Sequence, residues 1–262
     1  GLSTVGKVKD AAAEKPKVQP RTPVKSQIFS LAWSPAGDLL AAGGFQQVRL
    51  VDPATGKAAG ELGPHAEVVR GVAFSSDGKL LAAAGGLPGR KGEVKIWNIA
   101  ERRAAVTIEA HEDTAYAVAF SPDSTLLATS SYDRMIKLWD TATGKEVRTL
   151  KDHIDAVYSL AFTPDGRFLI SGSEDRGVKV WNPATGERLY TLSEPLDGVN
   201  AVAVHPGGKL IAAGGLDRTI RLWEIGEKSG TLKNSLIAHE GPILAIAFSR
   251  DGSRIVTASA DR

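Results

Sequence analysis

The chain repeats one stretch of sequence six times, and this repeat limits the fold more than any other feature. The clearest copy runs from His153 to Gly186 and consists of short apolar runs separated by turn signals such as Thr-Pro-Asp-Gly. With a fourth run just beyond it, the unit has apolar runs at 157–162, 167–172, 178–181 and 188–192. Four short strands joined by tight turns form an antiparallel meander. A single meander leaves apolar faces exposed, so we expect the copies to pack against one another.

The six copies are in register from residue 26 to residue 262. The residues that end the first strand are spaced 41, 46, 42, 42 and 44 positions apart, and each follows an alanine. They are Trp33, Phe74, Phe120, Phe162, Val204 and Phe248. A period of this length with four strands per unit is typical of the blades of a β-propeller. The first strands are continuous apolar runs, which favours strands that are covered on both faces.

The ends of the third strands carry a more specific signal. They read Trp97-Asn98, Trp139-Asp140, Trp181-Asn182 and Trp223-Glu224, with Val51-Asp52 in the first copy. With these endings the chain resembles the WD40-repeat β-propeller family, and bacterial WD40 repeat proteins in particular. Four histidines stand where that family has the His of its Gly-His dipeptide, namely His65, His111, His153 and His239. In blade 5 this position is occupied by Pro195.

The resemblance implies an all-β fold, a WD40-type propeller of four-stranded antiparallel blades. We expect five full blades plus half of a sixth, forming an open arc cut from a seven-bladed parent. The expected blades lie near 26–62, 68–108, 114–150, 156–192, 198–237 and 243–262, the last one incomplete. Because the chain lacks an initiator Met and stops after two strands of blade 6, we interpret it as a fragment of a longer protein.

Residues 1–25 differ in composition from the rest. They carry six Lys or Arg against two acidic residues and mix Lys, Pro and Ala without periodicity, which predicts a basic, solvated linker. Within it, Val18 to Thr22 falls where a fourth strand would be. In WD40 propellers a strand from the N-terminal side commonly completes the last blade, and the sequence leaves open whether this one does.

Composition argues against several classes of partner. The chain has 32 basic and 30 acidic residues, and without 1–25 the balance is 26 to 28. A nucleic-acid binder normally concentrates basic residues on one face, so we expect no nucleic-acid partner. There is no apolar run of 18 residues, and hence we expect no membrane span. The chain has no Cys, which excludes disulfides and Cys-ligated metal. We expect a soluble protein without cofactors, and the sequence does not distinguish the cytoplasm from the periplasm.

Two blades contain the complete set of residues that forms a structural tetrad in the WD40 family. The sets are His111, Thr129, Asp133 and Trp139 in blade 3, and His153, Ser171, Asp175 and Trp181 in blade 4. A Ser-His-Asp hydrolase triad uses the same residue types. The recurrence in successive blades and the lack of a G-x-S-x-G motif favour the structural interpretation. The histidines belong to different blades, so we do not expect them to converge on a metal ion.

Two smaller patterns also recur. An arginine follows the turn aspartate at Arg134, Arg176, Arg218 and Arg262, and we interpret it as half of a surface ion pair with a neighbouring blade. The turn Asp-Pro-Ala-Thr-Gly after residue 51 is similar to turns of quinoprotein propellers. The Trp endings and the register of the histidines argue against a quinone site.

The remaining candidate residues lie on one face. In the WD40 family, the residue four positions before the end of the first strand opens onto the top face, around the channel. Here these residues are Phe29, Arg70, Tyr116, Tyr158, Asn200 and Leu244, with Tyr132 and Glu174 preceding turn aspartates nearby and Arg90 on a Gly-flanked loop. Tyr and Arg are the usual anchors of interfaces. We therefore expect a non-catalytic scaffold that binds a protein or peptide on this face. The alternative is the propeller domain of a larger enzyme, or of a c-type haem or quinoprotein-like redox protein, with the chemistry in linked domains outside this chain.

Overall fold

The computed structural model describes residues 27–261 of the 262-residue chain. The expected linker at 1–25 and the expected strand at 18–22 lie outside these residues. The described part of the chain contains strands and turns and no helix. The strands form separate sheets, five of them with four strands and one with two. The fold is therefore all-β, as the sequence predicts.

Each sheet is an antiparallel meander whose strands follow the order of the chain. Blades 1 to 3 consist of β1 (Ser30–Trp33), β2 (Leu40–Gly43), β3 (Val48–Val51), β4 (Ala58–Leu62), β5 (Val69–Phe74), β6 (Leu80–Gly86), β7 (Gly92–Asn98), β8 (Arg103–His111), β9 (Ala115–Phe120), β10 (Leu126–Ser131), β11 (Met135–Asp140) and β12 (Glu146–Lys151). Blades 4 to 6 consist of β13 (Val157–Phe162), β14 (Leu169–Ser173), β15 (Val178–Trp181), β16 (Arg188–Leu192), β17 (Val199–Val204), β18 (Leu210–Gly215), β19 (Thr219–Ile225), β20 (Gly230–Ile237), β21 (Ile243–Phe248) and β22 (Ile255–Ser259).

The Thr-Pro-Asp-Gly turn of blade 4 shows how the sequence ends one strand and begins the next. The Gly166 N–H donates to the Thr163 carbonyl at 2.8 Å, and Gly166 has φ of 70°, which glycine adopts without a steric penalty. The Asp165 carboxylate accepts hydrogen bonds from the Thr163 hydroxyl and the Arg167 N–H. Because Arg167 is held in the turn, β14 begins at Leu169, and the predicted start at residue 167 was wrong.

The hydrophobic core lies between the blades. Each of the five buried clusters joins side chains of two successive sheets. Between blades 4 and 5, for example, Ile170 and Val180 pack with Val202 and Trp223. The alanines near the ends of the inner strands, such as Ala119 and Ala161, pack against these clusters. Larger side chains would separate neighbouring blades at this point, because protein interiors are close-packed.

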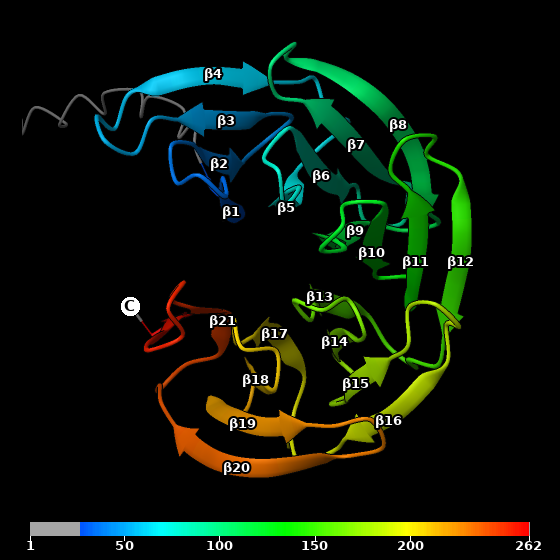
Figure 1. Ribbon diagram of the computed structural model, residues 1–262, viewed down its shortest axis with the longest axis vertical. Helices are drawn as coiled ribbons and strands as arrows, with labels where there is room; N and C mark the ends of the chain where they lie inside the picture. Colours follow the sequence, from blue (N-terminus) through cyan, green and yellow to red (C-terminus); the bar gives the residue numbers. More distant parts are fainter. Residues whose placement is uncertain (1–26, 262) are drawn as a thin grey trace, which may run out of the picture.

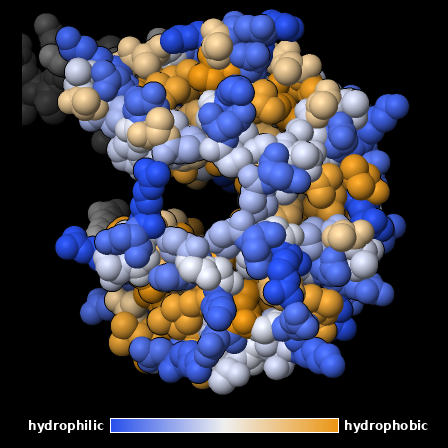
Figure 2. All heavy atoms as spheres, viewed as in Figure 1, coloured by the Kyte–Doolittle hydropathy of each residue, from blue (hydrophilic) through white to orange (hydrophobic). Residues whose placement is uncertain are grey.

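The blades form an open arc around a central opening (Figure 1; Figure 2). The first strand of each blade faces the opening, the fourth strand of blades 1 to 5 lies on the outside, and the arc is open between blades 1 and 6 (Figure 1). Beside β22, whose outer edge has no partner strand in residues 27–261, is a cavity of about 300 Å³. The residues that line it are Ile220, Leu222, Asn234, Leu236, Ala238, Ile255 and Thr257. Figure 2 shows apolar residues, in orange, over this part of the arc.

The open edge predicts self-association of the 262-residue chain. Val256 on β22 and Leu236 on β20 are 66% and 59% exposed, and an unpaired strand edge can pair with another chain. We expect concentration-dependent association in sedimentation velocity, weakened by about tenfold or more in the double variant Val256→Lys, Leu236→Lys. The control is Ile154→Lys, since Ile154 is 78% exposed on blade 4, away from the open edge. A monomeric wild-type chain at all concentrations would contradict this, as would an equal effect of the control.

Candidate functional site

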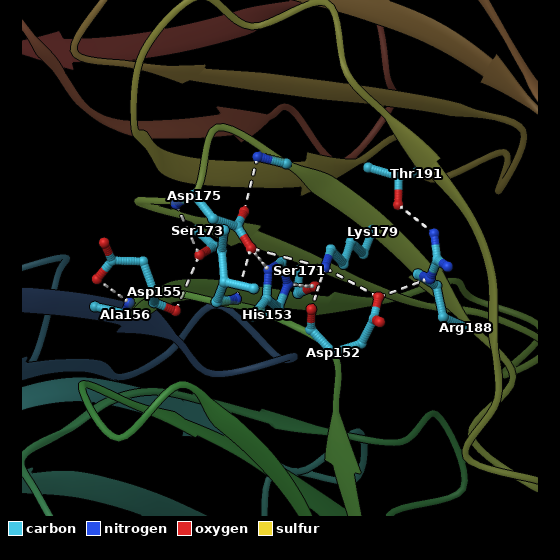
Figure 3. Close-up of polar contacts among 12 residues, drawn as sticks. Asp152, His153, Asp155, Ala156, Ser171, Ser173, Asp175, Lys179, Arg188 and Thr191 are labelled. Atoms are coloured by element: carbon cyan, nitrogen blue, oxygen red, sulfur yellow. Dashed lines mark hydrogen bonds and ion pairs between the residues drawn. The ribbon is translucent and has the colours of Figure 1, made fainter.

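In blade 4 the four tetrad residues form one chain of hydrogen bonds, of which Figure 3 shows His153, Ser171 and Asp175. The Trp181 Nε1–H donates to Ser171 Oγ at 2.8 Å. Ser171 Oγ lies 2.7 Å from His153 Nε2, and His153 Nδ1 lies 2.7 Å from Asp175 Oδ2. Burial lowers the pKa of His153, so the ring is neutral at pH 7. The ionised Asp175 carboxylate can only accept, so His153 Nδ1–H donates to it, and His153 Nε2 accepts the Ser171 hydroxyl.

The Asp175 carboxylate also organises the loops on either side of it. It accepts hydrogen bonds from the backbone N–H groups of Ile154 and Gly177 at 3.1 and 2.9 Å. Lys179 lies 3.7 Å from the same carboxylate and 3.0 Å from that of Asp152 (Figure 3). Since every member is hydrogen-bonded, the group stabilises the blade rather than leaving buried polar atoms unpaired. Ser171 is fully buried, so its hydroxyl is not placed to attack a substrate.

Blade 3 repeats this arrangement with a threonine hydroxyl. The Trp139 Nε1–H donates to Thr129 Oγ1 at 2.9 Å, and Thr129 Oγ1 lies 2.7 Å from His111 Nε2. His111 Nδ1 lies 2.9 Å from Asp133 Oδ2. Two blades therefore hold the same four groups in the same order, whereas a catalytic site occurs once.

The other blades contain altered versions. In blade 2 the hydroxyl position is Ala83, and the Trp97 N–H donates directly to His65 Nε2 at 3.2 Å. In blade 5 the Trp223 N–H donates to Glu194 at 3.2 Å, and Arg221 pairs with Asp217 at 2.6 Å. In blade 6 His239 contacts Thr257 and Asp261 at 2.8 and 3.0 Å.

We define the top face as the end of the blades that carries the His and Asp loops, 152–156 and 174–177 in blade 4 and their counterparts in the other blades. At the start of each inner strand from blade 2 to blade 6, one residue is skipped in the pairing with the second strand. The skipped residues are Arg70, Tyr116, Tyr158, Asn200 and Leu244. A β-bulge of this kind re-aims a side chain out of the regular alternation of the strand. The bulges thus mark the positions that the sequence singled out.

Across blades 1 to 4 these side chains contact one another as a continuous series. The Arg70 guanidinium carbon lies 5.9 Å from the centre of the Phe29 ring and 5.2 Å from that of Tyr116. The Tyr116 ring meets the Tyr158 ring edge to face at 5.0 Å and the Tyr132 ring at 6.5 Å. We call Phe29, Arg70, Tyr116, Tyr132 and Tyr158 the rim belt. The sequence indicated each residue by its position but did not indicate that their side chains contact one another.

The remaining top-face candidates lie outside the rim belt. The Asn200 amide donates to the Ile243 carbonyl at 2.9 Å and so joins blades 5 and 6. Arg90 is exposed on the loop between β6 and β7, where the Gly89 N–H donates to Asp113 of blade 3. Glu174 precedes the turn aspartate of blade 4, and burial together with the carboxylates of Asp155 and Asp197 raises its pKa.

Comparison with known families agrees with this geometry. A family model described as "WD domain, G-beta repeat" matches the chain in six segments, residues 19–47, 56–98, 103–140, 144–182, 186–224 and 230–262. The chain belongs to the WD40-repeat family. WD40 repeats generally act as protein-interaction scaffolds. No curated protein matches the chain as a relative.

Other kinds of site were sought in the same residues. Within 27–261, no group of three or more His, Asp or Glu side chains is arranged to hold a metal ion. The same part of the chain forms no helix of the length and hydrophobicity needed to cross a membrane.

The arginines that follow the turn aspartates in these WD40 repeats do not form the predicted ion pairs. Arg134, Arg176 and Arg218 have φ of 73°, 66° and 63°, and each closes a tight turn through its backbone N–H. None of these three side chains lies within ion-pair distance of a described carboxylate, so the prediction was wrong for them. Arg218 instead approaches the Glu240 carbonyl at 3.5 Å. Arg262 lies outside the described residues.

The tetrad of blade 4 predicts a large loss of stability for Asp175→Ala. Burial alone would raise the pKa of Asp175, but hydrogen bonds from His153 and from backbone N–H groups outweigh it and hold the pKa at about 2. Removing the carboxylate leaves His153 and these N–H groups unpaired, which we expect to cost about 2–4 kcal/mol in chemical denaturation. Asp251→Ala, which changes an exposed turn carboxylate, is the control and should cost less. Loss of a hydrolytic activity with unchanged stability would contradict a structural role.

His65 in blade 2 predicts that stability falls as the solution becomes acidic. Burial lowers the pKa of His65 to about 4 despite the nearby Glu93, so between about pH 4 and pH 6.5 the unfolded chain binds a proton at this residue and the folded chain does not. Stability is therefore lost as the pH falls from 6.5 towards 4. We expect His65 to contribute a loss of about 2 kcal/mol between pH 7 and pH 5. The measurement is urea unfolding of wild type and His65→Gln at both pH values. Equal pH dependence in the two proteins would contradict the prediction.

Proposed function

We propose that the chain is a non-catalytic scaffold that binds a protein or peptide partner on its top face through the rim belt. The continuous series of aromatic contacts around Arg70 carries this proposal. Tyr and Arg dominate the energetics of interfaces because each offers a large contact area together with hydrogen-bonding groups. Their occurrence at adjacent bulges gives one contact surface that spans several blades.

The rim belt is also ordered before a partner arrives. Each side chain of the rim belt contacts another member of it, so less side-chain freedom is lost on binding. Burial raises the pKa of Tyr116, and burial together with the carboxylate of Glu174 raises that of Tyr158 to about 12, so both hydroxyls stay protonated at neutral pH. Among the described residues, the hydroxyls of Tyr116, Tyr132 and Tyr158 have no hydrogen-bond partner, which leaves them free to meet a partner.

The arrangement of the tetrads supports the non-catalytic part of the proposal. Ser171 is buried, and its oxygen already accepts the Trp181 N–H. Its counterpart Thr129 is buried and bonded in the same way. Buried tetrads that hold the loops of the top face in place fit a scaffold whose binding groups lie on the surface above them.

The double variant Tyr116→Ala, Tyr158→Ala tests the proposal. We expect capture of the partner from the native host to fall by about tenfold or more, as for anchors at the centre of an interface. The melting temperature should change little, because both residues lie on bulges outside the strand ladder. Quantitative mass spectrometry of proteins recovered by each immobilised variant is the measurement.

A matched control is Tyr190→Ala. Tyr190 lies on the outer strand β16, and its hydroxyl donates to the Gly226 carbonyl. The control should recover the same proteins as the wild-type chain. Unchanged recovery by the double variant would overturn the proposed function.

A further inference from the structure

We propose that Arg70 is the point at which the rim belt binds an oxyanion of the partner, a carboxylate or phosphate group carried by a peptide segment. The proposal rests on the proposed function of the rim belt and adds the chemistry of what is bound. It is carried by the surroundings of the Arg70 side chain. Among the described residues, every other buried or half-buried Lys or Arg has a carboxylate or carbonyl partner, whereas Arg70 has neither.

Arg70 is half-buried, and rings approach its guanidinium from two sides. Its Nε is buried and has no hydrogen-bond partner. Within residues 27–261, no carboxylate lies within ion-pair distance of its guanidinium, and no carbonyl accepts a hydrogen bond from it. The rings of Phe29 and Tyr116 offer π faces to the cation and cannot accept its N–H donors in the plane of the guanidinium.

The other lysines and arginines that are buried or half-buried in residues 27–261 differ from Arg70 in one respect. Each lies within ion-pair distance of a carboxylate or donates a hydrogen bond to a backbone carbonyl. These residues are Arg49, Lys95, Lys137, Arg148, Lys179 and Arg221. A partly desolvated cation without such a partner is unfavourable, because the charge loses hydration without compensation. Arg70 is therefore the one member of this set whose partner the described chain does not supply.

The geometry of the guanidinium indicates the chemistry of the missing partner. Its donors lie in one plane as a fork that matches the two oxygens of a carboxylate or of a phosphate. The rings of Phe29 and Tyr116 restrain the guanidinium, so little freedom is lost when an anion binds. The neighbouring Tyr116 hydroxyl is protonated and has no partner within 27–261, so it is a further donor for the same anion.

Negative charge at the blade 4 end of the rim belt, near Tyr158, favours the Arg70 end as the site of the anion. Tyr158 lies near Glu174, whose carboxylate is close enough to those of Asp155 and Asp197 for their charges to raise its pKa, after burial. None of these three carboxylates has an ion-pair partner in the described residues, and together they repel an anion from the blade 4 end. Asp113 places a single carboxylate near Tyr116, where it accepts the N–H groups of Gly89 and Thr114, so the negative charge there is smaller than that of the three carboxylates at the blade 4 end.

The first experiment needs no identified partner. The nitrogen-15 labelled 262-residue chain is titrated with inorganic phosphate, and separately with acetate, at constant ionic strength. The arginine Nε–H signals are followed by NMR. The Arg70 signal, identified by its loss in Arg70→Lys, should shift and saturate. That of Arg134, an exposed arginine with no ion pair in 27–261, should shift less and without saturation. If the Arg70 signal saturates with phosphate but not with acetate, the site prefers a phosphate group; the reverse result indicates a carboxylate. Equal, unsaturated shifts of both arginines would overturn the proposal.

The second experiment separates this proposal from the function on which it rests. A random peptide library is selected on the wild-type chain and on Tyr116→Ala, Tyr158→Ala, and peptides that bind only the wild type are kept. We expect them to share an Asp or Glu. Changing that residue to Asn or Gln should weaken binding about tenfold, Arg70→Gln should weaken it equally, and the two changes together should weaken it no further. A phosphoserine at the same position tests the phosphate source.

The remaining outcomes are distinct. If the retained peptides lack a shared acidic residue and bind Arg70→Gln as tightly as the wild type, the oxyanion proposal is wrong and the rim belt remains a peptide-binding surface. If no peptide depends on the two tyrosines, both proposals are wrong. Arg134→Gln is the matched control and should leave binding unchanged. Thermal unfolding of Arg70→Gln and Arg70→Lys verifies that each variant is folded.

Discussion

Packing between successive blades is the interaction on which the rest of this structure depends. No sheet has a core of its own, because each buried cluster is shared by two neighbouring blades. Trp97, Trp139, Trp181 and Trp223 each lie in a cluster shared with the preceding blade. The indole N–H of the same tryptophans donates to the polar group beneath the top face. One side chain therefore joins the apolar contact between blades to the hydrogen bonds that hold the loops. The loops of the top face are therefore held by the same packing that joins the blades.

Much of this architecture could be predicted from the sequence because the residues that end strands and form turns recur in six copies of the repeat. The residue pairs Ala119-Phe120 and Ala161-Phe162 mark the ends of inner strands in the sequence and in the structure. The tetrad residues could be recognised because the residue types recur at fixed spacing, and their hydrogen bonds follow from that spacing. A structural role that recurs in several blades produces a repeated residue pattern in the sequence, and a role found in a single blade does not.

The features that escaped prediction are those that occur once or that depend on backbone conformation. Pro195 indicated that blade 5 lacks its histidine, but not that Glu194 accepts the Trp223 N–H in its place. Arg134 and Arg176 suggested ion pairs by their charge, whereas their positions are set by tight turns with positive φ. The contact between Arg70 and Tyr116 joins different blades and depends on the separation of two sheets. Alternation of apolar residues within one strand carries no information about such a separation.

The bulges at the start of the inner strands of blades 2 to 6 separate the residues of the top face from those of the core. The bulged residue has no cross-strand partner and lies outside the buried clusters between blades, so neither the ladder nor the core restricts its identity. The chain carries Arg, Tyr, Tyr, Asn and Leu at these equivalent places, while buried residues such as Val69, Val157 and Val199 stand just before three of them. Positions that pack the blades together and positions that face outward from the bulge are thus adjacent but separate in the sequence. The repeat places one such bulged residue in each of blades 2 to 6, around the opening. Each of these residues can be changed without altering the strand ladder or the buried clusters.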